Sequence, residues 1–178
     1  MHSNARQWHL DQLFVPFKDG YIKAQGVWDY GDKGAPWKFS LETDSMPLKL
    51  FQLPLHIDGL ADISMLTQGL SGDSVIVSHT LTGHIQVGIR NGMMQLNNKP
   101  QQFTLPPVNI TSDRGQIHVP LTPLTEENLN AKISGHWDFS QSTDGKLTLS
   151  VTEGEAQHQF DLLHPSSNQK TKQLPLTN

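Results

Sequence analysis

The sequence predicts an all-β fold, mainly antiparallel: a curved, groove-forming sheet of repeated hairpins or a partly open barrel, with one or two short helices. Three observations lead to this prediction. Patterns in which apolar and polar side chains alternate with the period of two that strands show dominate the sequence. Only 17% of residues are charged, so the polar positions are mainly Ser, Thr, Asn and Gln, as in exposed sheet rather than in helices. Turn pairs such as Asp19-Gly20 and Asp144-Gly145 separate the segments.

In the N-terminal half, three segments alternate regularly and are expected to be strands. They are residues 21–30, 36–43 and 60–67. Between the last two, the apolar phase slips by one residue, from Leu48 and Leu50 to Leu53 and Leu55. Such a slip predicts a bulge or a break in the strand.

The centre of the chain, residues 70–96, starts without alternation and then forms a regular strand. Asp73 or Ser74 can cap a short helix or turn, although the β-branched run at 75–77 disfavours a helix. The strand after it leads into Asn91-Gly92, which we expect to reverse the chain.

The C-terminal half continues the alternation, with strands expected at residues 102–110, 116–124, 132–139, 146–151 and 158–163. Residues 122–132 interrupt this series with a helical signal, because Thr125 can cap a first turn that carries Glu126 and Glu127. The polar, proline-containing residues 164–178 are expected to be a flexible tail. We therefore expect a single β domain over residues 1–163.

The motif K-x-x-G-x-W-D-aromatic occurs twice, starting at Lys23 and at Lys132. A polar loop and a second alternating segment follow each copy. This predicts a repeated hairpin at residues 20–43 and 131–152. The alternative is coincidence, because Trp, Gly and Asp are common at strand ends.

Bulk composition excludes several classes of function. The net charge is −4 and no Lys/Arg cluster occurs, so no nucleic-acid partner is expected. The chain has no cysteine, which excludes disulfides, zinc–thiolate sites and thiol catalysis. No apolar run approaches the roughly 20 residues that cross a bilayer, and residues 1–10 lack the apolar core of a signal peptide. As written, we expect a soluble chain without an export signal.

No catalytic motif is present, so the chain is predicted not to be an enzyme, with no catalytic residue and no cofactor. The stretch "GLSGD" at 69–73 departs from G-x-S-x-G. A carboxylate pair that meets only in the fold stays an open alternative, but Asp29 and Asp138 are expected to cap turns. His84, His118 and His136 share an outward phase in separate strands, so no metal site is predicted.

With catalytic and metal-binding motifs excluded, the remaining feature of the sequence is the set of apolar side chains on one face of the predicted strands. A sheet with few helices must bury this face against a second layer, close into a barrel, or offer it to a ligand. The side chains that could line such a groove, or alternatively pack a core, are Ile22, Trp28, Phe39, Ile85, Val87, Ile89, Ile133, Trp137, Leu147 and Leu149.

The block "DISMLTQGLSGDSVIVSHTLTGHIQVGIRNGMM" resembles the AsmA-like family of bacterial envelope proteins. The matching features are Gly72-Asp73-Ser74, then Leu81-Thr82-Gly83, then a strand that ends in Gly92-Met93. The preceding "GVWDYGDKGAPWKFSLETDSMPLKLF" is similar to the family's lead-in strands, and the resemblance covers residues 20–96.

The resemblance implies a non-enzymatic C-terminal region of an envelope protein, on the periplasmic side of the inner membrane. It further implies a curved sheet with an apolar groove, a phospholipid or other apolar ligand, and a role in lipid transport and envelope integrity. Membrane association would depend on an N-terminal anchor that this chain lacks.

Two other hypotheses stay open. One is a self-buried β-sandwich that binds other envelope proteins. The other is a carbohydrate-binding β module that stacks sugars on Trp8, Trp28, Trp37 and Trp137.

Overall fold

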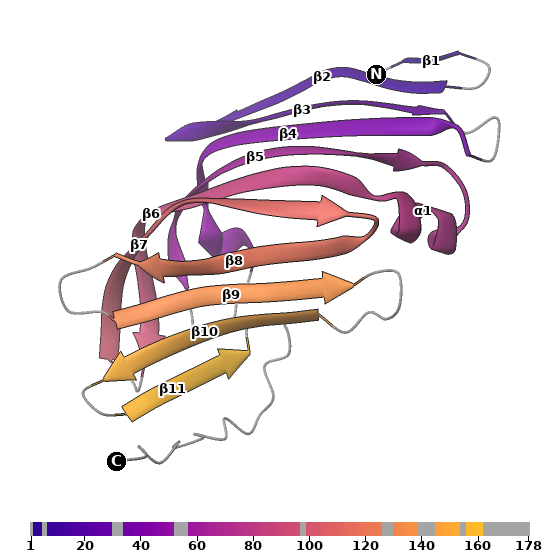
Figure 1. Cartoon of the computed structure of the whole chain (residues 1–178). Coiled ribbons are helices and arrows are strands. Elements are labelled where there is room, and N and C mark those ends of the chain that lie inside the picture. The colour runs from indigo at the N-terminus through magenta and orange to yellow at the C-terminus, as the bar shows by residue number, and fades with distance from the viewer. Residues whose placement is uncertain are drawn as a thin grey trace.

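The computed structural model describes residues 2–4, 7–29, 34–51, 57–96, 99–125, 130–138, 145–153 and 156–161. Over these residues the chain forms one eleven-stranded antiparallel sheet, in which every strand pairs with its neighbours in sequence (Figure 1). Among the described residues, β1 and β11 do not pair with each other, and the sheet is not closed into a barrel. The predicted all-β, curved and open sheet is therefore confirmed.

The strands of the N-terminal half are β1 (His2–Asn4), β2 (Gln7–Phe17), β3 (Gly20–Asp29), β4 (Pro36–Pro47) and β5 (Asp58–Leu70). Those of the C-terminal half are β6 (Thr82–Leu96), β7 (Lys99–Asp113), β8 (Gln116–Leu124), β9 (Asn130–Asp138), β10 (Gly145–Glu153) and β11 (Ala156–Asp161). A 3₁₀ helix, η1 (Leu48–Phe51), follows β4, and the α-helix α1 (Ser74–Thr80) joins β5 to β6. Figure 1 shows β2–β5 as an upper wall and β8–β11 as a lower wall, with β6 and β7 between them.

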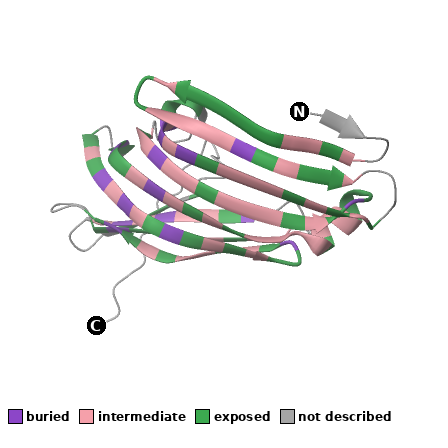
Figure 2. Ribbon diagram, turned by 90° about the horizontal axis from the view of Figure 1, so that it is seen from above, coloured by how far each residue is buried: buried purple, intermediate pink, exposed green. Residues whose placement is uncertain are grey.

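The strand register places the apolar phases of all central strands on one face of the sheet. One continuous cross-strand row shows this: Ile22, Thr43, Ile63, Val87 and Val108 are successive partners. Directly paired residues of antiparallel strands project to the same side, and residues two apart along a strand share it. Figure 2 shows the resulting alternation of exposure along the strands. We call the apolar side the inner face and the polar side the outer face.

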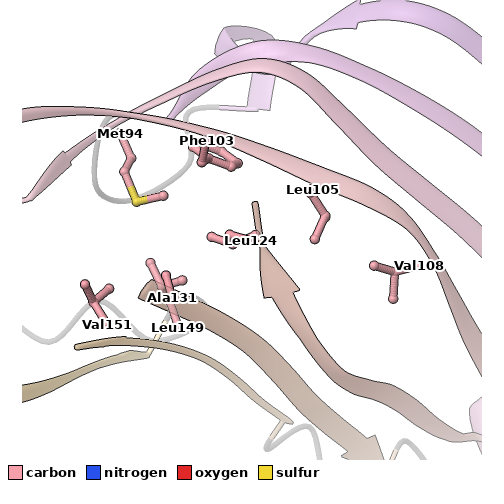
Figure 3. Close-up of a cluster of buried hydrophobic side chains, with 8 residues drawn as sticks. All are labelled: Met94, Phe103, Leu105, Val108, Leu124, Ala131, Leu149 and Val151. Carbon is pink, nitrogen blue, oxygen red and sulfur yellow. The ribbon is translucent and has the colours of Figure 1, made fainter. Parts of the chain in front are cut away.

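The hydrophobic core occupies the part of the inner face formed by β6–β10. It consists of Met94, Phe103, Leu105, Val108, Leu124, Ala131, Leu149 and Val151. Figure 3 shows the side chains of β6 and β7 directed toward those of β8–β10, so that the inner face closes on itself here. Met94 and Leu149 are only 1% and 2% exposed. This packing is the main apolar contribution to stability that the fold shows.

Asn91-Gly92 was predicted to reverse the chain, and this prediction is wrong. β6 continues through both residues to Leu96, and its register against β7 shifts between Ile89 and Gly92. Asn91 has φ 51°, a left-handed conformation that asparagine tolerates, which is typical of a β-bulge. The pair therefore bends a long strand toward the core instead of ending it.

An ionic network on the outer face ties together the bent parts of β4, β5 and β6. Arg90 binds the Asp62 carboxylate through Nε at 2.7 Å and a terminal nitrogen at 2.8 Å, and it reaches Asp44 at 3.0 Å. Ser45 has φ 55° at a register shift of β4, and its backbone N–H donates to Asp62. Hydrogen bonds from Arg90 lower the pKa of Asp62. The network fixes the geometry of the bulge in β4.

The two helical predictions had different outcomes. The short helix after Asp73 is confirmed as α1, and the Asp73 carboxylate accepts a hydrogen bond from the Ile76 N–H at 3.0 Å. The helix expected over 122–132 is wrong at both ends, because residues 122–124 belong to β8 and residues 130–132 to β9. Thr125 pairs with Thr104 as an isolated bridge, and residues 126–129 lie outside the described residues. Core packing of Leu124 and Ala131 favours the extended form over the local helical signal.

A strand break is present in residues 46–57 as expected, but it lies before Leu48 and not at the phase slip, because β4 ends at Pro47 and Leu48–Phe51 form η1. Residues 52–56 and the predicted flexible tail, 164–178, lie outside the described residues. The two K-x-x-G-x-W-D segments form β3 and β9, each of which starts a hairpin. Gly26 pairs with Phe39, and Gly135 pairs with Leu147, so each motif glycine faces a large apolar residue.

Candidate functional site: an apolar groove at the tryptophan end of the sheet

A row of tryptophans crosses the inner face at one end of the upper wall. Trp8 of β2 pairs with Trp28 of β3, and Trp28 pairs with Trp37 of β4. The next residue in the row is Gly69 of β5, where a Cβ would lie 2.9 Å from the Trp37 ring. The glycine therefore leaves the space that the Trp37 indole occupies. Trp8 and Trp28 remain 45% and 57% exposed, which is unusual for side chains of this size.

The adjacent row repeats this arrangement of a ring against a glycine. Leu10, Gly26, Phe39 and Thr67 are successive partners across β2–β5. A Cβ at Gly26 would lie 3.1 Å from Cδ2 of Phe39, so the phenyl ring extends over the glycine. The two glycines therefore make room for the Trp37 and Phe39 rings, which bound a depression on the inner face.

The depression is a cavity of about 450 Å³, a volume typical of a small-molecule site. Its lining comes from three consecutive residues on each of β2, β3 and β4, together with Thr67 of β5 and Val77 of α1. The lining residues are Trp8, His9, Leu10, Gly26, Val27, Trp28, Trp37, Lys38, Phe39, Thr67 and Val77. Strand alternation directs His9, Val27 and Lys38 to the outer face. The inner side chains are therefore mostly apolar, and their polar groups are the Thr67 hydroxyl and the indole N–H groups of the tryptophans.

Helix α1 is held at the end of this groove by hydrogen bonds on both of its sides. Before it, Ser71 donates its N–H to Ala35 O at 2.7 Å and its hydroxyl to Asp29 O at 2.6 Å. At its end, the Thr80 hydroxyl accepts from Leu70 N at 2.9 Å. These contacts anchor the helix to the ends of β3, β4 and β5. They place Val77 against the cavity and leave Val75 60% exposed.

The ten groove residues predicted from the sequence all lie on the inner face, but they divide into three groups. Trp28 and Phe39 line the cavity. Leu149 belongs to the core, and Val87, Ile89 and Ile133 pack against it. The others have intermediate exposure on the same face: Ile22, Ile85, Trp137 and Leu147. Core and groove therefore occupy different parts of one surface.

Nine of the eleven lining residues were not in the predicted set, and four of the nine carry apolar side chains on the inner side: Trp8, Leu10, Trp37 and Val77. Trp37 was on the apolar phase of its strand and could have been included. Trp8 and Leu10 were not assigned to a strand, because the segment from Gln7 to Phe17 alternates poorly. The register shift between Leu10 and Leu13 explains this, since the apolar phase changes at that bulge.

The ionisable residues that line the cavity, His9 and Lys38, project to the outer face. The inner lining of the cavity holds no carboxylate, and the groups with shifted pKa, Tyr21, Asp62 and Arg90, interact with outer-face residues. In the part of the chain that the structure describes, no group of three or more His, Cys, Asp or Glu residues could hold a metal ion. Over the same residues, no helix has the length and apolar character needed to cross a membrane.

Comparison with known proteins adds no assignment: no family model, no curated protein and no solved structure matches the chain. The functional argument therefore depends on the groove itself.

Proposed function

We propose that this chain is a non-enzymatic binding module that holds an apolar ligand, a phospholipid acyl chain or a similar lipid, in the groove at the tryptophan end of its sheet. The observation that carries the proposal is the cavity of about 450 Å³ on the inner face, with indole, phenyl and aliphatic walls. Such walls recognise hydrocarbon without directed polar contacts. Each methylene group transferred from water into them contributes about 0.8 kcal/mol.

The open architecture supports a ligand of this kind. Trp8 and Trp28 expose about half of their surface to solvent on the inner face, although the same face is tightly packed a few strands away. An exposed aromatic surface beside a cavity is typical of a binding site, because a monomer gains nothing from leaving it uncovered. A bound acyl chain would cover these rings and extend the apolar packing toward β6.

The biological setting that we propose comes from the resemblance to the AsmA-like family. On that basis the chain would be the C-terminal region of an envelope protein on the periplasmic side of the inner membrane. Its role would be in phospholipid transport to the outer membrane and in envelope integrity. The residues that carry the resemblance, 20–96, form β3–β6 and α1, and these elements supply most of the groove.

Two other functions have some structural support. The packed core between β6–β7 and β8–β10 favours a self-buried interaction domain over that part of the sheet. The exposed row of Trp8 and Trp28 would also suit a sugar ring, which stacks on aromatic faces. Under either of these two alternative functions, we expect that hydrocarbon does not bind preferentially in the groove.

Intrinsic fluorescence tests the proposal directly, because all four tryptophans lie in two adjacent cross-strand rows at the groove end. Trp137 occupies the same row as Phe39, connected through Thr67, Gly83, Ser112 and Ile117. The purified chain is titrated with a phospholipid brominated in its acyl chain, with the unbrominated lipid as control. We expect saturable quenching by the brominated lipid alone. Quenching by soluble oligosaccharides, with none by lipid, would support the carbohydrate hypothesis instead.

A further inference from the structure

A row of basic side chains crosses the outer face of the lower wall, opposite to the groove. His118 of β8 and His136 of β9 are direct partners in the antiparallel register. The same row continues to Lys146 of β10 on one side, and to Thr111 of β7 and His84 of β6 on the other. Their chain neighbours, such as Ile117 and Trp137, face inward, so alternation directs these imidazoles outward. His84, His118 and His136 are all exposed.

The sequence presents these histidines as scattered, and only the register brings two of them together. Residues directly opposite each other on antiparallel strands have Cβ atoms about 4.5–5.5 Å apart. Two imidazoles on such a pair can turn toward one point without any movement of the backbone. Among the described residues, neither His118 nor His136 takes part in a hydrogen bond or an ion pair, so their ring nitrogens are available.

We propose that His118 and His136 form a two-histidine chelate for a divalent transition-metal ion, Cu²⁺, Ni²⁺ or Zn²⁺. Neutral imidazole is a preferred ligand of these ions, and affinity at a given nitrogen site is highest for Cu²⁺. Two ligands held by a rigid sheet bind one ion more tightly than two free imidazoles, because their orientation is already fixed. Water molecules complete the coordination, so the site requires no third side chain.

The side chains next to the pair determine which further groups could take part in binding the metal ion. His84 lies two strands from His118, about 9.5 Å away at the usual strand spacing, and it is not needed for the chelate. Lys146 is the direct neighbour of His136 and disfavours a second positive charge. In the next row along the outer face, Gln116 pairs with Asp138.

The position of the pair gives metal binding a structural consequence. Among the described residues, the ladder between β7 and β8 consists of the pairs of Thr111, Ser112 and Asp113, and a separate bridge joins Thr104 to Thr125. β8 is therefore held to the sheet mainly through β9. An ion shared by His118 and His136 would link these two strands and raise the melting temperature of the folded chain.

The test measures binding of Ni²⁺ and of Cu²⁺ to the untagged chain by calorimetry at neutral pH, together with thermal unfolding. We expect one ion per chain, tighter binding of Cu²⁺, and a higher melting temperature with metal. His118→Asn and His136→Asn should each weaken binding at least tenfold and abolish the thermal shift. Both side chains are exposed, so circular dichroism of the variants should match that of the parent.

Two control substitutions decide whether the pair itself is the site. His84→Asn changes a histidine of the same row, and His79→Asn changes an exposed histidine of α1. Both variants should bind metal as the parent does. Absence of stoichiometric binding by the parent, or an equal loss in either control variant, would overturn the proposal. The site is on the face opposite to the groove, so either outcome leaves the lipid hypothesis unaffected.

Discussion

Replacing Trp28 with alanine removes part of the groove wall while leaving the core intact. Trp28 is 57% exposed and lines the cavity, whereas the core lies in β6–β10. We therefore expect weaker binding of an apolar ligand with little change in folding. Phe14→Ala is the matched control, because Phe14 is 54% exposed but projects from the outer face of β2, where its ring stacks on Tyr21 at 5.7 Å.

The size of the effect follows from the area that a ligand can cover. An aromatic side chain of this type offers about 250 Å², so the exposed part of Trp28 is about 140 Å². If a ligand covers half of this area, the lost contact is worth about 1.8 kcal/mol at about 25 cal/mol/Å². That free energy corresponds to a dissociation constant about 20-fold higher.

The assay displaces an environment-sensitive apolar dye with lipid, because the dye signal does not depend on the tryptophan that is removed. Trp28→Ala should raise the dissociation constant, and Phe14→Ala should leave it unchanged. Loss of the Phe14–Tyr21 stacking should lower stability by about 0.5–1.5 kcal/mol. Equal affinities for the Trp28 variant and the parent would refute the assignment of the groove. So would an equal loss of affinity in the two variants.

Three further predictions concern the fold. Leu149→Ala should cost about 2–5 kcal/mol, seen as a large fall in melting temperature, since the side chain is 2% exposed within the core. Gly92→Ala should destabilise by about 1–3 kcal/mol, because its Cβ would lie 2.6 Å from a core phenyl ring. Gly88→Ala, whose Cβ meets nothing closer than 3.6 Å, should stay within about 0.5 kcal/mol in the same denaturant titration. Arg90 lowers the pKa of Asp62, so this ion pair stabilises the fold above the ordinary aspartate pKa and less as the pH falls through the lowered value. Arg90→Gln should flatten that acid-side loss in melting temperature measured against pH; an unchanged pH profile would contradict the argument.

The class of fold was predictable because the alternation of apolar and polar side chains can be recognised within each segment. The strand register then keeps the apolar side chains of neighbouring strands on the same face. Each strand with a clear period of two, such as the one carrying Ile85, Val87 and Ile89, has its apolar residues on the inner face. The Asn91-Gly92 prediction failed for a reason outside the local sequence. The same pair serves a two-residue turn or a bulge, and the choice depends on whether the strand continues into the core.

The sequence predicts which side chains share the face that carries the groove, but it does not predict where on that face the groove lies. Alternation identifies which side chains share a side, yet burial depends on which walls meet, and that is a long-range property. Leu149 and Trp28 have the same apolar phase, but Leu149 is 2% exposed and Trp28 is 57% exposed. The Trp8–Trp28–Trp37 row likewise required the register, because these residues are separated along the chain. The same holds for the pair His118 and His136, whose proximity no spacing in the sequence indicates.

The core and the groove are formed by different strands, so substitutions in the two regions should affect different properties of the protein. The cavity is formed by β2–β5 and α1, and the core by β6–β10. In a self-buried sandwich, truncation of any inner-face side chain would lower stability. Here the inner face should respond in two ways: truncations in β9 and β10 reduce stability, and truncations in β2 and β3 reduce binding. Because the two groups of residues do not overlap, their effects on stability should add. A double substitution of Trp28 and Leu149 whose loss of stability departs clearly from the sum of the single losses would show that the groove and the core are one packed unit.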